Sequence, residues 1–335
     1  MSKKIIVSFL VILVIFISLG ILASAEVIKV KFGINQNTTT PQYRSSMLFA
    51  EKVKELSNGQ ILVTVYHSMQ LGGLREHPEM VQTGTIEMTK IPATTWSNFS
   101  KTLEAFDIPF LFKNTGALHD VANSPIGAEI ANTLKDEGIF PLGYSTGGLK
   151  QMTANKPIHH PDDLKGMKFR IMPSQILIKT YESFGANPTP VDFSEMYNAL
   201  QQGVVDGQEN PLQTVDMMKL WEVQKHLTLT NHAPMLYIVG ANKKWFDSLS
   251  TDLQQNILDA MEYALESEWK DNDMAEAAWL EKIKENGMIV YTPTEAELQA
   301  FRDKSKNVLD IIKERVGAAI IDRLLIAAEE ANNNN

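Results

Sequence analysis

Arg170 is the residue whose type and position point most directly to specific chemistry. In the run KFRIM at residues 168–172, the apolar side chains Phe169 and Ile171 face one side of a predicted strand, and Arg170 faces the other. Pro173 then ends the pattern, so Arg170 lies at the carboxyl end of its strand, where open α/β sheets bind ligands. A guanidinium there can hold a carboxylate through two parallel hydrogen bonds. An ordinary surface or interdomain salt bridge is the alternative.

Asn210 is the second candidate for a ligand contact. It follows a predicted short strand at residues 204–207 and precedes Pro211, an order that predicts an N-cap position at the start of a helix. Free backbone N–H groups and the positive end of the helix dipole lie at such a position. The amide of Asn210 can therefore cap the helix or turn toward a ligand, and the local sequence leaves both roles open.

Other catalytic or metal-binding patterns are weak. The chain has no cysteine, which removes thiolate metal ligands and cysteine nucleophiles. Residues 143–150 superficially match a phosphate loop, but Leu149 occupies the place of the required lysine. His159 and His160 are adjacent, so on a strand they point to opposite faces, and no pair of carboxylates stands out as an acid and a base. We expect no enzyme activity, no metal and no cofactor.

The elements that position Arg170 and Asn210 follow an α/β pattern. Polarity alternates in the predicted strand at residues 28–32, Thr40-Pro41 begins a helix with one apolar face, and residues 61–66 form a β-branched strand. Strand, helix and strand in this order predict a parallel pair. A second α/β region follows Thr146-Gly147-Gly148, where we place the first crossing between domains.

Two further elements are predicted in that second region and beyond it. Asp192 and Glu195 have the spacing of a capping box, with Asp192 as the N-cap. Residues 252–285 contain strong helix formers without Pro or Gly, which predicts one long helix or two helices joined at a kink. The tail at residues 331–335 is of low complexity and is expected to be disordered.

The bulk composition and the N-terminus indicate a secreted globular protein. The chain has 335 residues, of which 44% are hydrophobic, and a formal net charge of −9, which disfavours nucleic acid and anionic lipid as partners. Lys3 and Lys4 precede an apolar run at residues 5–22, and Ala23-Ser24-Ala25 matches a signal-peptidase site, so we expect cleavage after Ala25. An uncleaved membrane anchor is the alternative.

Three longer segments have a recognisable pattern: LKGMKFRIMPS, GANPTPVDFSEMYNALQQGVVDGQENPL and EVQKHLTLTNH. They resemble the TRAP family (tripartite ATP-independent periplasmic transporters), in its DctP-like extracytoplasmic substrate-binding subunit. VKFGINQNTTTPQYRSSMLFAEKVKELSNGQI and QLGG extend the resemblance over essentially the whole mature chain. The resemblance implies an α/β, two-lobed periplasmic binding protein fold with an interdomain cleft and a long connecting helix. We expect lobe I at residues 26–147 and about 236–272, and lobe II at residues 148–235 and about 273–330.

The resemblance also implies a function. A periplasmic monomer would capture a small organic acid by domain closure and deliver it to the small and large membrane subunits of a TRAP transporter. A ligand-sensing module that presents the acid to a membrane receptor kinase is the alternative. In such proteins the arginine matching Arg170 pairs with the ligand carboxylate, the asparagine matching Asn210 hydrogen-bonds the ligand, and the aromatic residue matching Phe193 packs on it. Asn35 is a weaker match of the same kind.

Departures from the family pattern leave the ligand open. Lys150 stands where many members carry a second arginine, and Leu74, followed by Arg75, stands where many carry an acid. C4-dicarboxylates, sugar acids, keto acids and aromatic acids all remain candidates. Trp96 and Tyr237 are expected to line either the cleft or the core. Sugar acids are slightly favoured by polar residues that we expect in the cleft, which are Asn35, Thr94, Thr95 and Gln151.

Overall fold

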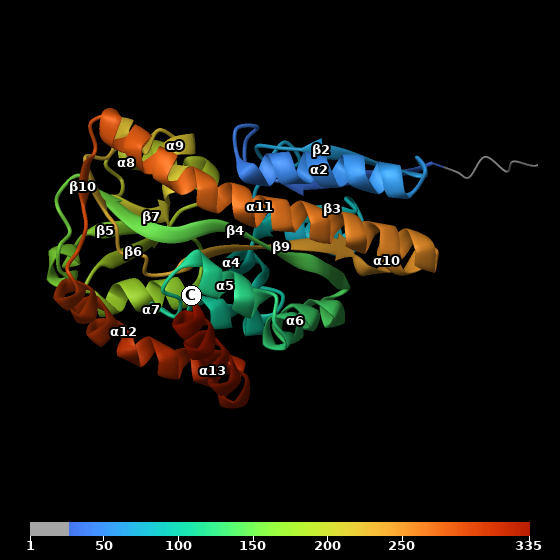
Figure 1. The fold of residues 1–335 in the computed structure, drawn as a ribbon. Coiled ribbons are helices and arrows are strands. Elements are labelled where there is room, and N and C mark those ends of the chain that lie inside the picture. The colour runs from blue at the N-terminus through green and yellow to red at the C-terminus, as the bar shows by residue number, and fades with distance from the viewer. Residues whose placement is uncertain (1–26) are drawn as a thin grey trace, which may run out of the picture.

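The computed structural model describes residues 27–335, so the predicted signal sequence and its cleavage site lie outside the described residues. Within that range, one mixed sheet has the strand order β2-β1-β3-β9-β4-β7-β5-β6, and β8 joins β4 to β10 (Figure 1). The strands are β1 (Ile28–Ile34), β2 (Ile61–Tyr66), β3 (Met88–Pro92), β4 (Ile139–Ala154), β5 (Lys168–Ile171), β6 (Asn187–Pro190), β7 (Gly207–Pro211), β8 (His226–Thr228), β9 (Pro234–Asn242) and β10 (Ile289–Tyr291).

Helices cover the sheet on both faces. The α-helices are α2 (Pro41–Leu56), α3 (Glu76–Thr83), α4 (Ala93–Trp96), α5 (Thr115–Ala122), α6 (Pro125–Asn132), α7 (Gln175–Ser183), α8 (Met196–Gln201), α9 (Leu212–Met217), α10 (Lys243–Ser248), α11 (Thr251–Glu285), α12 (Glu295–Val316) and α13 (Ala318–Asn334). Short 3₁₀ helices are η1 (Lys101–Asp107), η2 (Thr133–Glu137), η3 (Pro161–Leu164), η4 (Phe193–Glu195) and η5 (Leu220–Glu222). None of the helices described here is long and apolar enough to cross a membrane.

The two-lobed α/β architecture predicted from the sequence is confirmed. β1 pairs in parallel with β2 and with β3, and β5 pairs in parallel with β6 and with β7. Between these two parallel groups, β4 runs through both halves: its first part pairs with β9, and its last five residues pair with β7. The expected crossing at Thr146-Gly147-Gly148 is a register irregularity within β4, which continues beyond it as a strand.

One long helix joins the two halves. The run at residues 252–285 forms the single 35-residue helix α11, which begins at the Ser250 N-cap and lies across α2, β4 and α9 (Figure 1). Lys90 of β3 donates to Glu268 of α11 over 2.6 Å, and both side chains are fully buried. This ion pair fixes α11 to the half of the sheet that contains β1, β2 and β3.

The C-terminal residues are helical rather than disordered. α13 continues to Asn334, and Asn332 accepts a hydrogen bond from the Lys113 backbone N–H at 2.9 Å and donates to the Leu111 carbonyl at 2.8 Å. These contacts, together with buried Leu324 and Ala328 on the same helix, outweigh the low complexity of the tail. α13 shares an apolar core with α5 and η1, whereas Phe301 of α12 packs in a different core, together with Phe169 and Tyr181.

Candidate ligand-binding site

A small enclosed cavity lies between the two halves of the molecule, at the carboxyl end of β5. Its volume is about 20 Å³, which holds about one water molecule. One side of it comes from the loop before α3 and from α4 with the turn after it, and the other side from β5 and the segments that follow β5 and β6. The lining residues are Leu74, Arg75, Thr95, Asn98, Arg170, Met172, Pro173, Asp192 and Phe193.

Arg170 is the buried cation of this cavity. Phe169 and Ile171, its neighbours on β5, pack in the apolar core around Tyr181, so the alternation of the strand directs Arg170 to the opposite side, as predicted. Its Nε and Nη2 atoms donate to the Val191 carbonyl at 3.0 and 2.8 Å, whereas Nη1 is buried without a hydrogen-bond partner. One edge of the guanidinium is thus fixed by the backbone, and the Nη1–Nη2 edge is left for a ligand.

The charge on Arg170 is kept despite its burial. Burial lowers its pKa to about 10, and the negative charges of Glu209 and Asp192 oppose this shift. Arg170 therefore remains a cation at neutral pH, and no carboxylate lies within ion-pair distance of it among the described residues. A buried cation with an unpaired donor is costly unless a partner arrives, and an anionic guest is the partner that this geometry suits.

The rim of the cavity carries an ion pair that joins its two sides. Arg75 Nε lies 3.3 Å from Asp192 Oδ1, with side-chain exposures of 59% and 40%. The expected capping box at Asp192 is absent: Asp192 precedes η4 but makes no side-chain cap hydrogen bond. Phe193, the next residue, is half-buried and lines the cavity. Arg75 is a rim residue whose role the sequence reasoning missed.

Lys150 is buried behind the cavity in a separate network. Its Nζ donates to Glu209 Oε1 over 2.9 Å, and Glu209 Oε2 lies 2.9 Å from His232 Nε2. Burial opposes ionisation of Glu209, but Lys150 and His232 lower the pKa of that carboxyl to about 2. Because its charge is already compensated by Glu209, Lys150 offers a ligand much less than an unpaired cation would.

Asn210 does not occupy the predicted N-cap position. Strand β7 extends to Pro211, which is itself the N-cap residue of α9, so Asn210 lies within the strand, opposite Gln151 of β4. Its Nδ2 donates to Gln208 Oε1 at 2.5 Å. Gln151 donates to Asn231 Oδ1 at 2.5 Å and holds the turn before β9. Neither Asn210 nor Gln151 lines the cavity.

The remaining predicted site residues are buried away from the cavity lining. Trp96 is 0% exposed, packs in a hydrophobic core and reaches β9, where a side chain at Gly240 would collide with its ring at 2.7 Å. Tyr237 is also buried and accepts a hydrogen bond from Gln36 at 2.5 Å. The amide oxygen of Asn35 is buried without a partner. Of the polar residues expected in the cleft, the structure places Thr95 on the cavity wall.

Residues 143–147 match the Gly-x-Ser-x-Gly pattern of hydrolases, a match that the sequence reasoning missed. In hydrolases that serine lies exposed on a sharp turn between a strand and a helix. Ser145 instead lies inside β4, fully buried, and its Oγ has no hydrogen-bond partner. It therefore lacks both the exposure and the adjacent base that a nucleophile needs.

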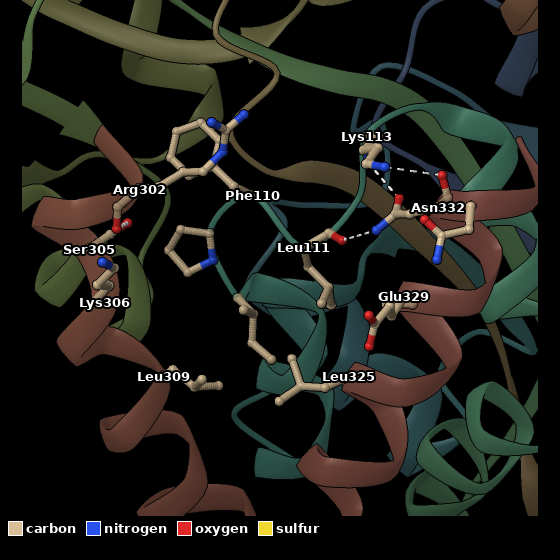
Figure 2. A pocket seen from close by; sticks show the side chains of 14 residues that line it. Phe110, Leu111, Lys113, Arg302, Ser305, Lys306, Leu309, Leu325, Glu329 and Asn332 are labelled. Carbon is tan, nitrogen blue, oxygen red and sulfur yellow. Dashed lines mark hydrogen bonds between the residues drawn. The ribbon is translucent and has the colours of Figure 1, made fainter. Parts of the chain in front are cut away.

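A wider hollow of about 560 Å³ lies on the outer surface between α12, α13 and residues 108–113 (Figure 2). It contains none of the residues predicted to bind a ligand. Its cations are engaged locally: Lys113 bonds the carbonyl of Asn332, Arg302 bonds Glu295, and Lys306 pairs with Asp303. This hollow has no buried unpaired cation like Arg170, so the small cavity is the better candidate site.

Comparisons with known proteins identify similar sequences. The model of the bacterial extracellular solute-binding protein family 7 (DctP) matches residues 32–315. The chain is 34% identical over 320 residues to the C4-dicarboxylate-binding periplasmic protein DctP of Rhodobacter capsulatus, covering 94% of this chain and 95% of that protein. It is 30% identical to the 2,3-diketo-L-gulonate-binding periplasmic protein YiaO of Escherichia coli, covering 83% and 84%.

Solved structures show the same fold. The sugar acid binding protein DctPAm of Advenella mimigardefordensis, in complex with galactonate, superposes with a TM-score of 0.88 at 30% identity, covering 92% of this chain and 100% of that chain. A TRAP periplasmic solute binding protein of Shewanella oneidensis with bound succinate gives a TM-score of 0.87 at 29% identity, covering 91% and 99%.

Proposed function

Because the chain belongs to the bacterial extracellular solute-binding protein family 7, we propose that it captures a small organic acid in the periplasm through Arg170. Family membership confirms the resemblance to TRAP substrate-binding subunits. Members of this family are solute-binding proteins rather than enzymes. The relatives named above bind a C4-dicarboxylate, a sugar acid or a diketo sugar acid, and all of these ligands carry a carboxylate.

The unpaired edge of Arg170 is the observation that carries the proposal. The Val191 carbonyl holds Nε and Nη2, so the orientation of the guanidinium is set before a ligand arrives. A carboxylate on the Nη1–Nη2 edge would form two parallel, charge-assisted hydrogen bonds and would satisfy the buried Nη1. Asn210, Lys150, Asn35 and Gln151 would support this site from behind rather than line it, and Phe193 would pack on the guest.

Closure of two lobes is the proposed mode of capture. The cavity of about 20 Å³ is too small for an organic acid, so its two sides must move apart to admit one. The sides belong to lobe I, built on β1, β2, β3 and β9, and to lobe II, built on β5, β6, β7, β8 and β10. Closing over a bound acid would expel water and strengthen its ion pair with Arg170. Helix α11 contacts both lobes and limits the direction of their motion.

We propose that the protein delivers the acid to the small and large membrane subunits of a TRAP transporter, a role that family membership supports. We propose that the exported protein acts as a monomer, after cleavage following Ala25. Purified transporter subunits reconstituted in vesicles test this role. Uptake of the acid into the vesicles should occur when the protein is present with the acid bound and should be absent without the protein. No uptake with a ligand-loaded protein and its matching subunits would contradict the transport role.

The binding function is tested by thermal unfolding of the protein purified from the periplasm against a library of organic acids. A ligand that binds only the folded protein raises the melting temperature. At least one carboxylate should raise it for the wild type and fail to do so for Arg170→Ala. The neutral amide of the same acid should have no effect. Equal shifts with the acid and its amide would show that the anchor is not the carboxylate.

A further inference from the structure

The ion pair between Arg75 and Asp192 at the rim of the cavity offers both a cation and an anion to a ligand. Arg75 comes from the residue before α3 in lobe I, and Asp192 comes from the residue before η4 in lobe II. The two side chains meet over 3.3 Å and both line the cavity that contains Arg170. A guest bound to Arg170 would therefore extend toward a carboxylate and a guanidinium that face each other.

The carboxylate of Asp192 is available to a guest. It makes no cap hydrogen bond to the helix that it precedes, and Arg75 is its ion-pair partner among the described residues. An ionised carboxylate accepts hydrogen bonds and donates none, and its two oxygens accept about four. Asp192 therefore has unused acceptor capacity at the cavity that contains Arg170.

The charges around the cavity also limit the charge of the guest. Arg75 and Arg170 contribute two positive charges and Asp192 one negative charge, so the lining carries 2 − 1 = +1. The nearby carboxylate of Glu209 is compensated by Lys150. One carboxylate on Arg170 balances this lining, whereas a second carboxylate on the guest would compete with Asp192 for Arg75 and lie beside a like charge.

We propose that Asp192, held by Arg75 from the opposite lobe, is a specificity-determining residue that selects hydroxylated monocarboxylates and disfavours dicarboxylates. A hydroxyl group at the far end of the guest donates to Asp192 and accepts from Arg75, so both partners are satisfied. A second carboxylate satisfies Arg75 alone, because it has no proton to donate to Asp192. Thr95 and Asn98 add further donors and acceptors for hydroxyl groups on the lobe I side. This inference rests on the proposed binding function.

The test uses pairs of acids with equal carbon number that differ in one terminal group, CH₂OH or COO⁻. The pairs are glycerate and tartronate, threonate and tartrate, and gluconate and glucarate. Calorimetry on the full exported protein measures both affinities of each pair. The wild type should bind the hydroxylated monocarboxylate of its best pair about tenfold more tightly than the dicarboxylate. This factor lies between the one expected for two like charges in contact in water and the larger one expected for the same charges near a protein surface.

Two variants distinguish Asp192 from other sources of this preference. Asp192→Asn removes the charge at nearly constant shape, so the dicarboxylate should gain about tenfold relative to its partner and the ratio should approach one. Arg75→Gln leaves Asp192 unpaired, so the dicarboxylate should lose affinity further. Glu195→Gln is the matched control, since Glu195 is an exposed carboxylate on the same 3₁₀ helix outside the cavity lining, and it should keep the wild-type ratio.

Each alternative result has one meaning. A wild type that binds the dicarboxylate of its best pair as tightly as the monocarboxylate, or an Asp192→Asn variant with the wild-type ratio, would overturn the role of Asp192 while the binding function stands. Failure of every acid to bind, with Arg170→Ala behaving like the wild type, would instead overturn the proposed function and this inference together.

Discussion

Replacing Arg170 by alanine is the most direct test of the site. The substitution removes the guanidinium whose Nη1–Nη2 edge is assigned to the ligand carboxylate. Truncating one partner of a buried, hydrogen-bonded charge pair costs about 2–5 kcal/mol of binding free energy, which corresponds to roughly 30- to 5,000-fold in Kd. Arg170→Lys keeps the positive charge but loses the planar fork and the bond to Val191. We expect it to lose about 1.5–3 kcal/mol, the value of one charged hydrogen bond.

The same substitution has a calculable effect on stability. Without Arg170, the Val191 carbonyl loses the donors at 3.0 and 2.8 Å that satisfy it. An unsatisfied buried acceptor costs about 1–3 kcal/mol, so Arg170→Ala should unfold at lower temperature and still fold. Each variant's ligand-induced shift must therefore be compared with its own melting temperature. Arg323→Ala is the control, because Arg323 forms a bidentate pair with Glu129 on the exposed surface.

Calorimetry with the acid identified by the thermal screen measures the affinities of these variants. We expect the wild type and Arg323→Ala to have the highest affinity, Arg170→Lys a lower affinity, and Arg170→Ala the lowest. Wild-type affinity in Arg170→Ala would refute the assignment of the carboxylate anchor. Wild-type affinity in Arg170→Lys alone would show that position 170 supplies charge and no planar geometry.

Three further predictions concern buried charges of the protein. The pKa of Glu209 is lowered to about 2 in the folded protein, so its charge contributes about 3 kcal/mol to stability above about pH 4.5. This contribution should be lost as the pH falls toward 2, and Glu209→Gln should flatten this part of an acid-denaturation profile. Burial raises the pKa of Asp107 to about 6, so ionisation of this carboxyl destabilises the fold as the pH rises from about 4 to 6. Asp107→Asn keeps an acceptor for Thr94 and should raise the melting temperature at pH 8 while leaving it unchanged at pH 3. A rise at both pH values would show that ionisation of Asp107 is not the cause. Lys90→Met should destabilise by about 3–5 kcal/mol in urea unfolding because it leaves Glu268 charged and buried, and adding Glu268→Gln should recover part of the loss.

Local sequence patterns predicted the elements well where the apolar spacing was unambiguous. The parallel pairing of β1 with β2, the long helix α11 and the direction of Arg170, opposite to Phe169 and Ile171 on β5, all follow from periodicity and from turn residues. The start of α2 at Pro41, with Thr40 as its side-chain cap, follows from the same signals. These features depend on neighbours within a few residues, which a single sequence displays.

Predictions that depended on distant partners were less successful. Asp192 has the spacing of a cap, but its carboxylate pairs with Arg75, 117 positions earlier in the chain (192 − 75). Asn210 precedes a proline, but pairing with β4 extends its strand past the predicted N-cap. For Trp96 the sequence left cleft and core both open, and it belongs to a core because Gly240, on a strand that pairs with β3, leaves room for its ring. Each outcome was decided by a contact that local spacing does not display.

The division of the site between the lobes separates affinity from specificity. Lobe II supplies Arg170 on a strand and fixes it through its own backbone, so the carboxylate anchor does not depend on closure. Lobe I supplies Arg75, Thr95 and Asn98 from a loop, a short helix and a turn, and these reach the guest only when the lobes approach. Substitutions on the lobe I side can therefore change which acid permits closure without removing the anchor. Under the proposal above, the discrimination between acids in this chain lies at the contact between Arg75 and Asp192.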